Sequence, residues 1–222
     1  GTGEPVLQHA LPHAELDFTN VQPQSSDAFE NGFNLAWQWQ ANPQPEWLGE
    51  PTSSRLRLNT VEMPENFWQA GNLLMQKFPA EAFSVKTRFE FSPAAAGDAA
   101  GLVVFGYDYS WTGLVFDGPG LHLQQRIRNE ARDGGDERVV AERHVEGGPV
   151  YLRLDVEKGA VCRFSVSLDG LRYESFGQTF TARQARWVGA KAGLFAGRPG
   201  EAEVENGRTG FADFSNWEVT VR

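Results

Sequence analysis

The sequence predicts an all-β fold in which two antiparallel sheets pack face to face, as a β-sandwich or jelly roll. Three observations support this. Many short segments alternate apolar and polar residues with the period of two that is typical of strands. Glycine and proline separate these segments at short intervals. No long stretch has apolar residues at the helical spacing of i, i+3, i+4 and i+7, which favours two packed sheets.

The strands expected from alternation follow one another along most of the chain, at residues 56–61, 83–91, 121–128 and 150–156. The run 101–105 is continuously apolar, which predicts a strand buried on both faces. Residues 163–168 and 171–173 flank Asp169-Gly170, a pair typical of a tight hairpin turn. The only weak helical candidate is 64–71. A five-bladed propeller would need a repeat of about 40–50 residues, and no such repeat is present.

The chain divides into two unequal parts. Residues 1–22 contain several prolines and little periodicity, which predicts a linker or a strap lying on a neighbouring domain. Residues 23–222 form the expected sandwich, which is an ordinary size for one all-β domain.

Composition excludes several classes of partner and site. The formal net charge of −9 disfavours nucleic acid, which requires clustered lysine and arginine. No run of about 18 apolar residues is present, so no membrane span is expected. The single cysteine, Cys162, cannot form an internal disulfide or a cysteine-based zinc site, and its alternation with apolar neighbours predicts a core position.

Recognisable catalytic motifs are absent, and the four histidines are scattered along the chain. Glycoside hydrolysis requires only two carboxylates flanking a sugar bond, so an assembled pair is possible in principle. Most acidic residues, however, lie at turns or at exposed strand positions, where solvated charge is the ordinary explanation. An autonomous glycosidase is therefore the least favoured function.

The most distinctive segment is 35–48, in which Trp37, Trp39 and Trp47 are interspersed with amide side chains. On a strand, the first two tryptophans share one face while Gln38 and Gln40 share the other. Indole rings can cover the apolar faces of a sugar, and amides can bind its hydroxyl groups. Alternatively, Trp37 and Trp39 fill the core between the sheets, and the polar face then becomes the ligand surface.

Other expected strands offer polar faces of the same kind. We expect the following residues to contribute to a sugar-binding surface with the amides above: Gln76, Tyr107, Tyr109, Gln124 and Arg126. A neutral surface that is rich in amides and aromatic rings suits a neutral polysaccharide.

Several segments, in order, resemble the C-terminal module of family 43 glycoside hydrolases of the β-xylosidase and α-L-arabinofuranosidase type. They include L-A-W-Q-W-Q-A-N-P at 35–43, N-L-L-M-Q-K-F-P at 72–79, G-D-A-A-G-L-V-V at 97–104, W-V-G-A-K at 187–191 and G-F-A-D-F at 210–214. The resemblance implies a concanavalin A-like sandwich, and residues 3–6 resemble the end of a preceding catalytic propeller. It also implies that the catalytic carboxylates lie in that five-bladed domain.

The resemblance leaves two roles open. The module binds xylan or xylo-oligosaccharides, or it is a structural domain that packs on the propeller and shapes its active-site pocket. Sandwiches of this kind often hold a structural calcium ion near the two chain ends, and Asp27 and Asp213 match that position. The compartment stays open, with a secreted or periplasmic location slightly favoured over the bacterial cytoplasm.

Overall fold

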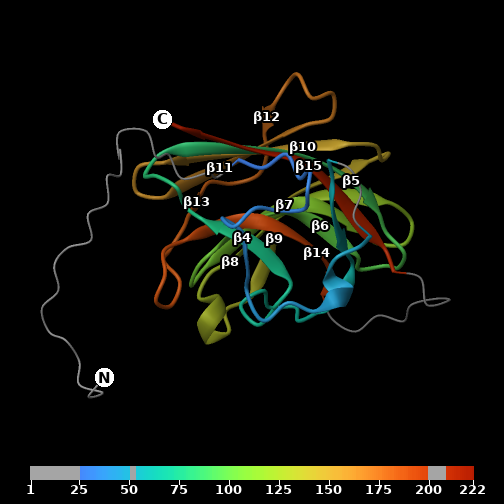
Figure 1. Cartoon of the computed structure of the whole chain (residues 1–222), viewed down its shortest axis with the longest axis horizontal. Helices are drawn as coiled ribbons and strands as arrows, with labels where there is room; N and C mark the ends of the chain where they lie inside the picture. Colours follow the sequence, from blue (N-terminus) through green and yellow to red (C-terminus); the bar gives the residue numbers. More distant parts are fainter. Residues whose placement is uncertain (1–25, 51–53, 200–208) are drawn as a thin grey trace, which may run out of the picture.

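The computed structural model describes residues 26–50, 54–199 and 209–222, and the predicted strap at 1–22 lies outside them. Two twisted sheets pack face to face, one above the other in Figure 1. All strand pairs within the sheets are antiparallel except β3 with β14. The predicted two-sheet sandwich is confirmed. No helix in the described part of the chain is long and apolar enough to cross a membrane.

The first sheet has eight strands. Its order is β1 (Gln38–Trp39), β4 (Leu73–Lys77), β14 (Lys191–Pro199), β6 (Ala99–Phe105), β7 (Tyr109–Phe116), β8 (Leu121–Arg128) and β9 (Glu137–Val145), with β3 (Val61–Met63) beside β14. Within the described ranges, helical structure is confined to two single-turn 3₁₀ segments, η2 (Pro45–Trp47) and η3 (Ala131–Asp133).

The second sheet has seven strands. Its order is β12 (Glu174–Ser175), β11 (Val161–Ser167), β10 (Val150–Glu157), β5 (Phe83–Ser92), β15 (Phe211–Val221) and β2 (Leu56–Asn59), with β13 (Phe180–Thr181) beside β11. Inward-facing residues of both sheets form one core, in which Cys162 is fully buried as predicted. Burial raises the pKa of this thiol to about 12.

The eight-stranded sheet also buries part of its outer face. Strand β6 is buried along its whole length because Leu102 faces the main core while Val103 faces a second apolar cluster outside the sheet. We call this second group the outer-face cluster; it contains Phe67, Phe105, Tyr109, Trp111 and Phe195, among others. The continuous apolar run at 101–105 is therefore part of a strand buried on both faces, as predicted.

Two local predictions were wrong. The expected strand 56–61 is interrupted at Thr60, because β2 pairs in one sheet and β3 in the other. There the Thr60 hydroxyl donates to the buried carboxylate of Asp98, 3.0 Å away. The weak helix at 64–71 is instead a loop that folds onto the outer-face cluster, with Phe67 fully buried.

The Asp169-Gly170 turn is present, but the hairpin around it is wider than predicted. The register pairs Val166 with Glu174, and six residues, 168–173, separate the two strands. The Asp169 carboxylate accepts hydrogen bonds from the backbone N–H groups of Leu171 and Arg172 and from the Ser167 hydroxyl. These bonds lower the pKa of Asp169 to about 2. They also stabilise a loop that is longer than the expected two-residue turn.

Candidate functional site

A row of polar side chains crosses the outer face of the eight-stranded sheet at β8 and β9. We call it the polar strip and define it as Gln124, Arg126, Glu137 and Glu142. In β8 these residues alternate with Leu123 and Ile127, which lie in the main core, so Gln124 and Arg126 must project outward. Strand pairing places Arg126 beside Trp111 on one side and Gln124 beside Glu142 on the other.

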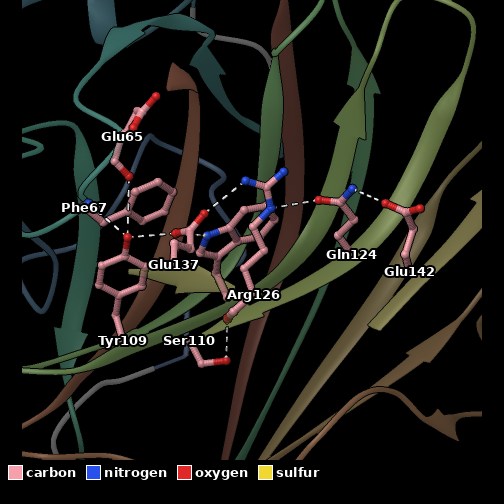
Figure 2. Close-up of polar contacts among 9 residues, drawn as sticks. Glu65, Phe67, Tyr109, Ser110, Gln124, Arg126, Glu137 and Glu142 are labelled. Carbon is pink, nitrogen blue, oxygen red and sulfur yellow. Dashed lines mark hydrogen bonds and ion pairs between the residues drawn. The ribbon is translucent and has the colours of Figure 1, made fainter. Parts of the chain in front are cut away.

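Glu137 is the centre of this network (Figure 2). Its carboxylate accepts hydrogen bonds from the Tyr109 hydroxyl at 2.7 Å, from Trp111 Nε1 at 3.2 Å and from Arg126 Nη1 at 3.0 Å. The register of β8 and β9 shifts between Gln125 and Arg126, which indicates a β-bulge. A bulge bends its strand and redirects side chains, and here Glu137 lies just beyond it. Three donors on one carboxylate fix its position.

Arg126 connects this anchored carboxylate to the rest of the strip. Its guanidinium carbon lies 5.2 Å from the centroid of the Trp111 ring, a cation–π distance. Its Nε donates to Gln124 Oε1 at 2.8 Å, and Gln124 Nε2 in turn donates to the Glu142 carboxylate, as Figure 2 shows. The strip is thus a chain of charge-assisted hydrogen bonds across two strands.

The floor beneath the strip is aromatic. The Phe67 ring stacks on Tyr109 with centroids 5.2 Å apart and on Trp111 at 6.0 Å. The backbone N–H of Phe67 also approaches the Tyr109 hydroxyl at 3.4 Å. Burial and the neighbouring Glu137 carboxylate raise the pKa of Tyr109, so the phenol keeps its proton and remains a donor.

A hollow with a volume of about 400 Å³ opens at one end of the strip. It is lined by Glu65, Arg126, Arg128, Asp136, Glu137 and Pro199. Arg126 and Glu137 are 27% and 14% exposed, whereas Glu142 at the other end is 50% exposed. The arrangement therefore presents guanidinium donors and carboxylate acceptors at fixed positions toward solvent, which is suited to binding the hydroxyl groups of a sugar.

Sequence comparison identifies a family for this sandwich. The family model described as the β-xylosidase C-terminal concanavalin A-like domain matches residues 26–220. The chain belongs to this family. The predicted resemblance to the C-terminal module of family 43 glycoside hydrolases is thereby confirmed.

A curated relative is a β-xylosidase of Formosa agariphila, which is 26% identical over 220 residues. The match covers 88% of this chain and 36% of that protein. The solved GH43 protein BlXynB of Bacillus licheniformis matches with a TM-score of 0.78 and 23% identity, covering 94% of this chain and 41% of that one. A xylan β-1,4-xylosidase from Bacillus halodurans gives 0.72 and 18%, covering 97% and 42%. The chain thus spans less than half the length of these relatives.

Of the three predicted tryptophans, Trp37 is buried, whereas Trp39 and Trp47 are half-buried. Trp37 is 6% exposed, packs against Trp217 at a centroid distance of 4.9 Å, and donates from Nε1 to the Asp27 carboxylate at 3.0 Å. Trp39 is half-buried against the core and packs on Trp47, 5.2 Å away. Of the two alternatives, the core-filling one describes Trp37, and a sugar cannot reach its ring.

The predicted amides separate into two groups. Gln38 pairs with Met75 of the outer-face cluster, so Gln38 and Gln40 project on the same face of the sheet as the polar strip. Both are half-buried. Gln76 instead lies inside, where its Oε1 accepts a hydrogen bond from Trp217 Nε1 at 3.2 Å.

The predicted tyrosines also differ. Tyr109 is fully buried beneath the strip. Tyr107 is half-buried outside it, where its ring stacks on Trp68 and lies 5.4 and 5.7 Å from the guanidinium carbons of Arg132 and Arg183. The structure thus joins Gln124 and Arg126 in one network, and places Tyr107 apart from it.

The two acidic residues considered for calcium already have protein partners. Both oxygens of Asp213 accept from the guanidinium group of Arg57, each at 2.7 Å. The Asp27 carboxylate accepts from the backbone N–H groups of Phe29 and Asn34 as well as from Trp37. Among the described residues, no group of three or more metal-ligating side chains converges. Calcium requires six to eight oxygens, and both of these carboxylates are already engaged by protein donors.

Three residues of the site were missed from sequence, namely Trp111, Glu137 and Glu142. Trp111 alternates with Ser110 and Thr112, a pattern that would place its ring in the main core, whereas the ring lies in the outer-face cluster. The bulge breaks the alternation of 137–145, which hides the shared face of the two glutamates. The alternation of 121–128, by contrast, did identify Gln124 and Arg126.

Proposed function

We propose that this chain is a non-catalytic accessory module of a family 43 glycoside hydrolase of the β-xylosidase type, and that its polar strip contacts xylan or xylo-oligosaccharides. The observation that supports sugar contact most directly is the fixed network around Glu137. A xylose residue offers hydroxyl groups that both donate and accept. A preorganised row of guanidinium, amide and carboxylate groups can bind such hydroxyls with little loss of side-chain entropy.

The absence of catalysis is part of the proposal, and the carboxylates that are held by several donors support it. A glycosidase needs one carboxyl group that can give up a proton and a second that can act as nucleophile or base. Glu137 is occupied by three donors, and Asp98 and Asp213 form ion pairs with arginines. Hydrolysis of an aryl xyloside by this chain alone, abolished by one carboxylate substitution, would overturn this part.

Sugar contact is tested by calorimetric titration of the chain with xylohexaose, comparing Arg126→Gln with Arg163→Gln. Arg126 lies in the strip, whereas Arg163 lies 48% exposed on the outer face of the other sheet and pairs with Glu157. We expect Arg126→Gln to weaken binding roughly tenfold, because about 1.4 kcal/mol corresponds to one lost charge-assisted bond. Arg163→Gln should leave this site unchanged. No heat with millimolar ligand would leave only a packing role.

The second candidate is a structural domain that packs on the catalytic propeller. It is favoured by Trp187, whose indole is 89% exposed on a loop where this residue has a φ of 67°. Large exposed aromatic side chains are typical of binding surfaces. We expect the chain to associate with a separately expressed GH43 propeller, and Trp187→Ala to weaken that association. An unchanged affinity for the propeller would count against this role of Trp187.

A further inference from the structure

A second groove lies on the opposite side of the sandwich, on the outer face of the seven-stranded sheet. Its volume is about 220 Å³, and it is lined by Lys86, Thr87, Arg88, Tyr151, Gly170, Tyr173, Asn216 and Glu218. In β5, Lys86 and Arg88 alternate with Val85 and Phe89 of the main core, which places both cations on the outside. The groove is therefore separate from the polar strip.

Two tyrosine rings form the walls of this groove. Tyr151 projects from β10, and Tyr173 comes from the loop that follows the Asp169-Gly170 turn. A Cβ atom at Gly170 would lie 2.9 Å from Tyr151 Cζ, so only glycine allows the loop to approach the ring so closely. The Asp169 carboxylate accepts hydrogen bonds from the backbone N–H groups of Leu171 and Arg172, which fixes the loop that carries Tyr173.

Each ring has a cation beside it. Lys86 Nζ lies 5.8 Å from the centroid of Tyr173, and the guanidinium carbon of Arg88 lies 5.9 Å from that of Tyr151. Arg88 forms an ion pair with Glu90, and Lys86 is the cross-strand neighbour of Glu218. The positive charges are thus balanced by acidic groups, so the groove has no strong preference for an anion.

The backbone of β15 is irregular at this groove. Its register with β5 shifts between Ser215 and Trp217, which leaves Asn216 as the extra residue of a β-bulge. Asn216 has a φ of 58°, in the left-handed region that asparagine tolerates better than most residues. Bulges are common next to functional sites, where they redirect a side chain. Here the bulge adds an exposed amide to the groove.

We propose that this groove is a second carbohydrate-binding site, which binds a neutral sugar residue of an oligosaccharide chain independently of the polar strip. Phenol rings cover the apolar C–H faces of the sugar, while Lys86, Asn216 and Glu218 bind its hydroxyl groups as donors and acceptors. The volume is below the roughly 300–1,000 Å³ of pockets for drug-sized ligands. It therefore fits one sugar residue and not a long stretch of a chain.

The position of the groove allows it and the strip to be occupied at the same time. The two sites are on opposite outer faces of the sandwich, so a polysaccharide can occupy the groove while another molecule covers the strip. Two weak sites on one module can raise the overall avidity for a long polysaccharide, provided that the chain can reach both. A polysaccharide bound in the groove is held on the face opposite the strip and leaves the strip accessible.

The test is a nuclear magnetic resonance titration of the ¹⁵N-labelled chain with xylohexaose and with cellohexaose, up to millimolar concentrations. We expect the amide signals of Gly170 and Asn216 to shift. Tyr173→Ala should weaken this binding about three- to tenfold, as expected for loss of a stacked ring. Tyr173→Phe should retain it. Leu171→Ala is the matched control, because Leu171 is 85% exposed in the same loop and does not line the groove.

The outcomes separate this proposal from the function proposed for the strip. Shifts at the groove that disappear in Tyr173→Ala and persist in Arg126→Gln support an independent site. The groove proposal is overturned if neither oligosaccharide moves the Gly170 and Asn216 signals, or if Tyr173→Ala binds like the parent chain. Stronger shifts with glucuronate than with the neutral sugars would overturn the assignment to a neutral ligand. Thermal melts of each variant verify that it is folded.

Discussion

Glu137→Gln is the substitution that most directly tests the network described above. The carboxylate accepts three hydrogen bonds, from Tyr109, Trp111 and Arg126, at 2.7 to 3.2 Å. Glutamine keeps the shape but has one acceptor oxygen, and its NH₂ group must face at least one of these donors. A bond to a charged group contributes about 1.5–3 kcal/mol, and a buried donor without a partner costs about 1–3 kcal/mol. We therefore expect a loss of about 2–4 kcal/mol in the free energy of unfolding.

Urea denaturation followed by tryptophan fluorescence measures this loss directly. Glu142→Gln is the matched control, because Glu142 is 50% exposed and accepts only at the rim of the network. A half-exposed charged group contributes little, so we expect this control to lie within about 0.5 kcal/mol of the parent chain. If Glu137→Gln costs no more than the control, the strip is not preorganised and the argument for sugar contact at this site fails.

Three further predictions concern other buried groups. Asp98→Ala should cost about 3–5 kcal/mol in the same denaturation assay. The substitution leaves the guanidinium of Arg198 without its carboxylate, and the Arg198 side chain is only 4% exposed. A loss below about 1 kcal/mol would refute this. Cys162 should not react with a thiol reagent at pH 8 until urea unfolds the chain, since burial raises its pKa to about 12. Because that thiol ionises more readily in the unfolded chain, stability should fall as the pH rises above about 9. Neither calcium nor EDTA should change the melting temperature, and a rise with calcium would contradict the Arg57 pairing of Asp213.

The fold could be predicted well because alternation is a direct consequence of one face being buried. Strand β8 has the bounds expected from 121–128, and 101–105 lies within the fully buried β6. The failures occurred where tertiary contacts override the local pattern. The chain changes sheets at Thr60 because that residue bonds to Asp98, 38 positions away. The hairpin after β11 is widened by the side chain of Asp169, which no pattern of apolar residues reveals.

The candidate site was only partly predictable, for a related reason. Alternation divides a strand into two faces but does not say which is inside. For the segment around Trp37 this is decided by packing against Trp217, which lies 180 positions away in the sequence, and by the bond to Asp27. Glu137 depends on a bulge in β9, and the aromatic floor depends on the loop that carries Phe67. Polar positions on a regular strand were predicted, whereas those created by irregular backbone were not.

Irregular backbone is also what distinguishes the two proposed sugar sites from the rest of the sandwich. A regular sheet face presents side chains in a fixed lattice, with neighbours about 4.5–5.5 Å apart. The bulge between β8 and β9 allows the Glu137 carboxylate to meet donors from β7 and β8, and the bulge at Asn216 adds an amide beside two tyrosines. Both bulges lie away from β6, which is packed on both of its faces. The rigid core thus allows each outer face to carry its own binding surface.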